Sequence, residues 1–170
     1  LIVHLPSFLE KGKGITIVVM PTVALAMDQE KNAQEHYENV GDSAYRPQAY
    51  YSGISQDKKN LIFRGIKEGT IPILYISPEA ILNSNFYDLL LEAAAQDKIN
   101  RLVIDEAHIV IDWGASFRTE FQFLSIFRKR LLEISNKKIK TVLLSATITD
   151  RSTEILKKLF SEGDNFFEIR

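Results

Sequence analysis

The amino-acid sequence predicts an α/β domain with a mainly parallel sheet and helices on both faces of that sheet. Short apolar runs alternate along the chain with stretches of helical length, which is the order that crossover helices and parallel strands produce. The runs are apolar at nearly every position, as strands buried on both faces are. Four of them end abruptly in polar or Pro/Ser/Thr clusters. We therefore expect these clusters to lie along one edge of the sheet, where such folds bind ligands.

Six apolar runs are expected to form strands, because they are short, rich in β-branched residues and followed by turn residues. They span residues 15–20, 48–51, 72–76, 102–104, 141–144 and 165–169.

The intervening stretches are expected to form helices, of which the clearest has apolar residues at spacings of three and four over 117–134. The expected helices span residues 1–10, 22–38, 56–67, 85–96, 117–134 and 150–160.

Local signals define two of these helices more closely. Thr22 is an N-cap residue for the second helix, and Gly69 follows the third as a C-cap glycine does. In the third helix, Leu61, Ile62 and Ile66 are expected to face the core.

Composition and charge restrict the class of protein. The chain of 170 residues is expected to be one domain over 1–170, with 45% hydrophobic and 25% charged residues. A net charge of −1 gives no overall basic field, so a nucleic-acid surface must be local. The basic clusters 128–130 and 137–140 contain no aromatic residue and are expected to be solvated faces. The absence of cysteine excludes disulfides and cysteine-bound metals.

The ends of the chain and its apolar runs suggest a location. No run approaches the roughly 20 apolar residues of a membrane span, so we expect no membrane partner. No signal peptide is visible either, and we expect a cytoplasmic, nucleoid-associated or nuclear location. The chain begins at Leu1 and not at Met, and we expect it to be part of a longer protein.

The most informative polar cluster is Asp105-Glu106, directly after the apolar run 102–104. One carboxylate at such a strand end can hold Mg²⁺, and the next can orient or deprotonate a water molecule. The pair therefore favours half of a nucleoside-triphosphate site. The alternative is a strand that ends in a charged turn without any catalytic role.

Five clusters together resemble the motifs of RecQ-type superfamily-2 DNA helicases, in the right order over about residues 1–150. The most specific are the DEAH sequence and the aromatic-rich loop that follows it. The matching stretches are 20–29 (MPTVALAMDQ, motif Ia), 75–79 (YISPE, motif Ib), 105–108 (DEAH, motif II), 112–121 (DWGASFRTEF, aromatic-rich loop) and 145–147 (SAT, motif III).

The resemblance implies the first motor domain of a helicase, with a RecA-like P-loop NTPase fold that uses ATP and Mg²⁺. Asp105 would hold Mg²⁺, Glu106 would act on the attacking water, and both acids with His108 would form part of the nucleotide site. The segment Ser145-Ala146-Thr147 would couple the state of the nucleotide to DNA. For His108, the alternative is a solvent-facing histidine at a helix start.

The resemblance also implies a surface for single-stranded or duplex DNA. Trp113 and Phe117 would stack on unpaired bases, and Arg118 would pair with a phosphate or with an acid. Backbone phosphates would be contacted around Pro21-Thr22 and Ser77-Pro78. The alternatives are core packing for Phe117 and plain helix capping for the hydroxyls.

The chain departs from the family pattern in one place, because it contains no G-x-x-x-x-G-K-[ST] phosphate loop. We expect that loop, its strand and a second motor domain to belong to the longer protein. By its resemblance to this family, the longer protein is expected to act in DNA repair or recombination. The chain alone is then expected to bind ATP very weakly and to expose a sheet edge. Two alternatives stay open: a catalytically idle nucleic-acid-binding module, and an ATPase that moves on duplex DNA without unwinding it.

Overall fold

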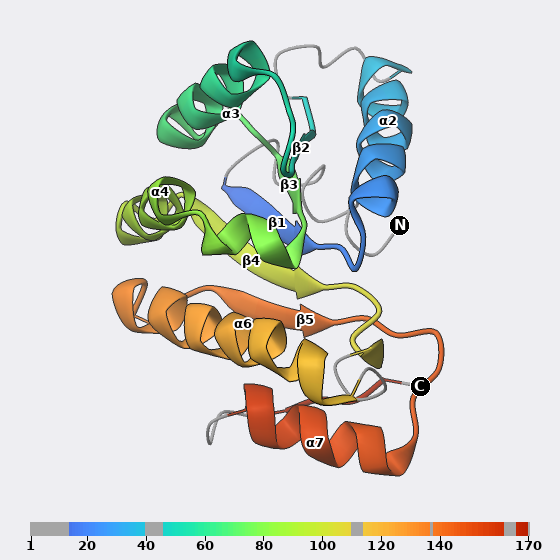
Figure 1. Cartoon of the computed structure of the whole chain (residues 1–170). Coiled ribbons are helices and arrows are strands. Elements are labelled where there is room, and N and C mark those ends of the chain that lie inside the picture. The colour runs from blue at the N-terminus through green and yellow to red at the C-terminus, as the bar shows by residue number, and fades with distance from the viewer. Residues whose placement is uncertain (1–13, 40–45, 110–113, 137, 162–165, 170) are drawn as a thin grey trace.

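A parallel five-stranded sheet forms the centre of the molecule (Figure 1). The computed structural model describes residues 14–39, 46–109, 114–136, 138–161 and 166–169, with the backbone alone for 39 and 114–122. The spatial order of the strands is β2-β3-β1-β4-β5, and every neighbouring pair is parallel, as the sequence predicts. The strands are β1 (Ile15–Val19), β2 (Gln48–Tyr50), β3 (Ile73–Ile76), β4 (Ile99–Ile104) and β5 (Lys140–Leu143).

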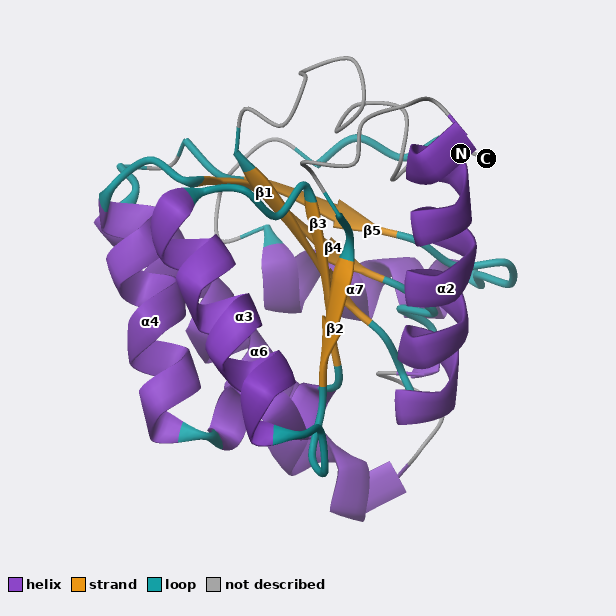
Figure 2. Ribbon diagram, turned by 90° about the horizontal axis from the view of Figure 1, so that it is seen from above, coloured by secondary structure: helices purple, strands orange, loops and turns teal. Residues whose placement is uncertain are grey.

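Helices cover the sheet on both faces, which confirms the three-layer α/β fold (Figure 2). Helix α2 lies on one face and α3, α4 and α6 lie on the other, while α7 packs beside α6 at the β5 end of the sheet (Figure 1). The helices are α2 (Val23–Asn39), α3 (Gln56–Glu68), α4 (Ser84–Ala95), α6 (Gly114–Ile134) and α7 (Asp150–Phe160), with a short 3₁₀ helix η1 (Pro78–Leu82). None of the helices in the described part of the chain has the length and apolar character that a bilayer crossing requires.

The continuous apolar runs are explained by two separate cores, one on each face of the sheet. Alternate residues of β1, such as Ile17 and Val18, enter different cores, because successive side chains of a strand point to opposite faces. The larger core joins the sheet to α3, α4, α6 and α7. The smaller core joins it to α2.

Helix α2 faces the sheet with an unusual stripe of small and polar residues. Ala26, Glu30, Ala33 and Tyr37 recur at helical spacing, and all four are buried. The Glu30 carboxylate accepts a hydrogen bond from the backbone amide of Ala49 at 2.9 Å through Oε1. Its Oε2 lies 2.7 Å from Lys58 Nζ. Glu30 therefore satisfies an amide of the edge strand β2 and ties it to α2 and α3.

Replacing Glu30 with Ala is expected to destabilise the chain by about 1–3 kcal/mol, because it leaves the Ala49 amide without its acceptor and removes the partner of Lys58. Urea unfolding of the 170-residue chain measures the change. Glu35→Ala, on the exposed side of the same helix, is the matched control. A free energy of unfolding for Glu30→Ala within about 0.5 kcal/mol of that control would contradict the assigned role.

Most expected elements are present, with shifts of one to three residues at their ends. Strand β4 begins at Ile99 and not at 102, because its ladder with β1 continues through polar residues. The expected strand at 165–169 is wrong for the described part, since 166–169 have no regular structure. The helix at 1–10 lies outside the described residues.

Two side chains contradict their predicted environments. Leu61 does not face the core and is 55% exposed, although Ile62 and Ile66 are buried as expected. Arg128 is 5% exposed, and its Nε donates to Thr141 Oγ1 at 2.9 Å, so this member of the basic cluster is not solvated. The single-sequence pattern missed it because the long arginine side chain reaches from α6 to the neighbouring strand.

Candidate active site

The four polar clusters lie side by side at the carboxyl edge of the sheet, because they follow the adjacent parallel strands β3, β1, β4 and β5. Backbone hydrogen bonds continue the ladder beyond the strands and tie these ends together. The donors and acceptors are Met20 N to Ile76 O, Asp105 N to Val19 O, Leu144 N to Ile104 O and Ala107 N to Leu144 O. The predicted edge of the site is therefore formed by backbone pairing and does not depend on side-chain conformation.

The paired acids adopt a tight backbone turn after β4. Asp105 Oδ1 accepts a hydrogen bond from the amide of Glu106 at 2.9 Å. Glu106 has a φ of 51°, in the left-handed region that glycine or asparagine usually occupies. Such a conformation costs on the order of 1 kcal/mol in a residue with a long side chain. The two neighbouring carboxylates have different neighbours, since Asp105 Oδ1 meets the Glu106 amide and Glu106 Oε2 lies 3.1 Å from His108 Nδ1.

His108 joins the acids to the end of β5. Its Nδ1 lies 2.9 Å from Ser145 Oγ and 3.1 Å from Glu106 Oε2. Because the single hydroxyl proton of Ser145 is donated to the carbonyl of Thr147 at 2.7 Å, Ser145 Oγ accepts from His108. The network therefore assigns the proton to Nδ1 of His108. Half-buried His108 is not simply a solvent-facing residue, and motifs II and III are in direct contact.

The predicted phosphate-contacting hydroxyls differ in their exposure. Thr22 is exposed, and its Oγ1 accepts a 3.3 Å hydrogen bond from Leu25 N, which is the expected N-cap of α2. Ser77 is 1% exposed and precedes η1 without a side-chain capping bond, and Pro78 is buried as well. Pro21 is half-buried beside Thr22. The exposed Thr22 can thus meet a ligand at the surface, whereas the side chain of Ser77 is buried.

The aromatic-rich loop is only partly described. Trp113 lies outside the described residues, so its stacking role stays a prediction. Phe117 and Arg118 lie in α6, where only the backbone is described at these two positions. The core-packing alternative for Phe117 therefore stays open. Further along the same helix, Leu124 and Phe127 are buried as its apolar periodicity predicts.

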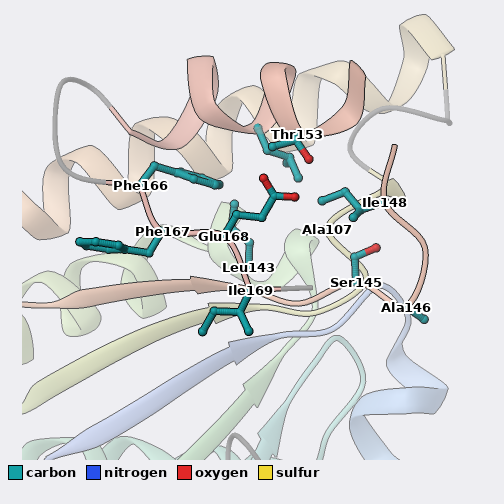
Figure 3. Close-up of a pocket in the computed structure, with 11 residues that line it drawn as sticks. Ala107, Leu143, Ser145, Ala146, Ile148, Thr153, Phe166, Phe167, Glu168 and Ile169 are labelled. Atoms are coloured by element: carbon teal, nitrogen blue, oxygen red, sulfur yellow. The ribbon is translucent and has the colours of Figure 1, made fainter. Parts of the chain in front are cut away.

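A pocket of about 410 Å³ lies beyond β5 and is lined in part by Ser145 (Figure 3). Ala107, Leu143 and Ser145 form one side of it, and the Glu168 carboxylate points toward Thr153 across it. None of its lining residues is cationic. The described lining of the pocket therefore contains no positive charge that could neutralise the phosphates of a nucleoside triphosphate.

The acids fit a magnesium ion of the kind that nucleotide sites hold. Among the described residues, no group of three or more acidic, histidine or cysteine side chains surrounds a metal position. Mg²⁺ in such sites commonly takes only one or two carboxylates and completes its shell with water and phosphate oxygens. Asp105 can supply one such oxygen, because its Oδ2 accepts no hydrogen bond from the described residues while Oδ1 is held by Glu106.

Comparison with known proteins identifies the family. A family model for DEAD/DEAH box helicases matches residues 1–156. The chain belongs to the DEAD/DEAH box helicase family. The RecQ-type resemblance is also confirmed, because the similar curated proteins are RecQ-family helicases.

Two relatives illustrate the similarity and its extent. The ATP-dependent DNA helicase RecQ of Synechocystis sp. is 31% identical over 128 residues, which cover 75% of this chain and 24% of the relative. The ATP-dependent helicase SGS1 of Saccharomyces cerevisiae is 30% identical over 181 aligned residues, covering 98% of this chain and 12% of the relative. The chain thus spans about a quarter or less of these proteins' lengths.

Solved structures agree in fold. The DUF1998 helicase MrfA bound to DNA and AMPPNP superposes with a TM-score of 0.70 at 18% identity, over 92% of this chain and 20% of that one. A hypothetical ATP-dependent RNA helicase from Sulfolobus tokodaii gives a TM-score of 0.56 at 19% identity, over 94% of this chain and 41% of that one. The fold of the described residues is therefore that of helicase RecA-like domains.

Proposed function

We propose that this chain is the first motor domain of a RecQ-type DNA helicase, in which ATP hydrolysis drives movement along one DNA strand and separates the duplex. The observation that supports it most is the contact of Glu106 and Ser145 with a single histidine at the carboxyl edge of the sheet. The relatives named ATP-dependent DNA helicases support the same substrate and fuel.

The two acids divide the chemistry of hydrolysis. Bound Mg²⁺ would supply positive charge that offsets the phosphates, with Asp105 as its protein ligand. Glu106 orients the attacking water and accepts its proton. His108 would keep the Glu106 carboxylate beside the end of β5 while the water is aligned, since its Nδ1 lies 3.1 Å from Glu106 Oε2. The left-handed backbone at Glu106 sets the direction of this side chain independently of Asp105.

Coupling to DNA runs through the end of β5. Ser145 and Glu106 both contact His108, so a displacement of 145–147 would move the histidine that lies against the catalytic acid. DNA would bind across Thr22, the helix start at Pro78 and the aromatic-rich loop, where Trp113 stacks on unpaired bases. A second motor domain of the same protein would supply the positive charge that the described lining of the pocket lacks. The whole protein would act in the cytoplasm, at the nucleoid or in the nucleus.

Two alternatives make different predictions. An idle binding module has no need for adjacent acids at a strand end, and a duplex translocase has no need for a stacking loop. Hydrolysis by the full-length protein, measured without DNA, with single-stranded DNA and with blunt duplex, separates them. We expect stimulation by single strands well above that by duplex. Stimulation by duplex alone would favour the translocase, and no hydrolysis under any condition would favour the idle module.

Residues 1–170 alone are expected to bind Mg–ATP with a dissociation constant above the micromolar range. They are also expected to show no measurable ATP hydrolysis. The physical reason is that the sequence contains no phosphate loop and the pocket beside Ser145 has no cationic lining residue. Isothermal titration of the isolated chain with Mg–ATP tests this. Micromolar binding would contradict the expectation.

A further inference from the structure

Asn83 joins the short helix η1 directly to helix α4. Its backbone N–H donates to the carbonyl of Ala80 at 3.2 Å, which closes η1. Its side-chain Oδ1 accepts a hydrogen bond from the amide of Phe86 at 3.1 Å, as an N-cap residue does. Its carbonyl accepts from the amide of Tyr87 at 2.9 Å. The two helices are therefore held end to end as one unit, and Tyr87 lies in the first turn beyond the junction.

The ring of Tyr87 ties this unit to helix α6. Its centroid lies 5.9 Å from that of Phe123 and 5.5 Å from that of Phe127, with interplanar angles of 49° and 50°. These separations lie within the range of favourable aromatic pairs. Phe127 is fully buried, whereas Tyr87 and Phe123 are half-buried at the edge of the larger core. Since η1 also packs against α6, the three helices η1, α4 and α6 contact one another on one face of the sheet (Figure 1).

The elements joined in this way carry two parts of the predicted DNA surface. Pro78 is the first residue of η1, and Phe117 and Arg118 lie near the start of α6. The element η1 follows β3 and α6 follows β4, and β1 lies between these two strands in the sheet. Strand pairing therefore does not join the two parts directly, whereas the packing of the helices does.

We infer that Tyr87 is a positioning residue for DNA binding: its ring holds α6 against the η1–α4 unit, so that both parts of the DNA surface meet one strand together. The inference rests on the proposed function, in which one DNA strand runs across both parts. A strand held at one part meets the other at a high effective concentration, which raises affinity only when the strand spans both. Fixing the two parts in advance also lowers the entropy cost of the second contact.

The test is the Tyr87→Leu variant of the full-length protein, which keeps an apolar side chain and removes the ring. Binding of labelled oligothymidylates of increasing length is measured by fluorescence anisotropy, and ATP hydrolysis is measured as a function of DNA concentration. We expect about tenfold weaker binding of oligonucleotides that span both parts, and unchanged binding of the shortest oligonucleotide that still binds. The DNA concentration for half-maximal stimulation should rise by a similar factor, while the maximal stimulated rate changes much less.

Two further variants separate this role from a general loss of packing. Tyr87→Phe keeps the ring and should retain the affinity of the wild type for long strands. Phe63→Leu is the matched control, because Phe63 is half-buried at the edge of the same core, with its ring 6.0 Å from those of Tyr50 and Phe86. It packs between α3, β2 and α4, and its loss should leave the dependence of affinity on strand length unchanged.

Three results would overturn the inference: wild-type affinity for long strands in Tyr87→Leu, an equal loss in Phe63→Leu, or an equal loss for short and long strands. A defect in Tyr87→Phe as large as that in Tyr87→Leu would also overturn it. A wild-type protein whose affinity does not rise with strand length would instead contradict the two-part DNA surface of the proposed function, and the inference would fail with it. That result is distinct, because it is seen before any substitution is made.

Discussion

Replacing Glu106 with Gln should reduce ATP hydrolysis by the full-length protein about 10²–10⁴-fold, the range that a positioned general base contributes. Glutamine keeps the length and shape of the side chain but cannot accept a proton from water. Its side-chain carbonyl oxygen can keep the place of Glu106 Oε2 beside His108, and the hydrogen bond between His108 and Ser145 does not depend on residue 106. The measurement is phosphate release at saturating ATP, Mg²⁺ and single-stranded DNA.

The control for this substitution is Glu154→Gln, which makes the same change on the exposed surface of α7 and should leave the rate unaltered. Binding of single-stranded DNA should be the same in wild type and both variants, since the proposed role of Glu106 lies in the nucleotide site and not on the DNA surface. A Glu106→Gln rate within about threefold of the Glu154→Gln rate would show that Glu106 is not the catalytic base.

Replacing Trp113 with Ala should abolish most of the stimulation of ATP hydrolysis by single-stranded DNA and leave the DNA-independent rate unchanged. A base stacked on an aromatic ring contributes about 1–3 kcal/mol, so the loss of one such contact weakens DNA binding about 5- to 150-fold. Hydrolysis as a function of DNA concentration measures both the affinity and the maximal stimulation.

Trp113→Phe is the conservative variant for this position, because phenylalanine keeps a flat ring. It should recover most of the affinity for single-stranded DNA. If Trp113→Ala retains full stimulation, or if Trp113→Phe is as defective as Trp113→Ala, stacking is not the role of this residue.

The arrangement of the candidate site could be predicted from the sequence because it depends on backbone topology. Once the apolar runs are recognised as parallel strands, the residues that follow them must share an edge, and Thr22, Asp105 and Ser145 do so. The helix periodicity of 117–134 and the capping signals at Thr22 and Gly69 were equally reliable, since they are local.

What the sequence did not predict depends on contacts between elements. The burial of Arg128 requires knowing that Thr141 lies beside α6, and the polar start of β4 is held by its ladder with β1. The bond between His108 and Ser145 joins residues 37 positions apart. The left-handed backbone of Glu106 has no composition signal, because glutamate is not a residue that favours it.

Strand separation by the full-length protein tests most directly whether the edge acids drive a DNA motor. A duplex with a single-stranded tail is mixed with ATP and Mg²⁺, and release of the labelled strand is followed for wild type and Glu106→Gln. We predict complete separation by the wild type and none by Glu106→Gln, at equal occupancy of the tail. Equal separation by both proteins, or none by a wild type that binds the tail, would contradict the proposed function.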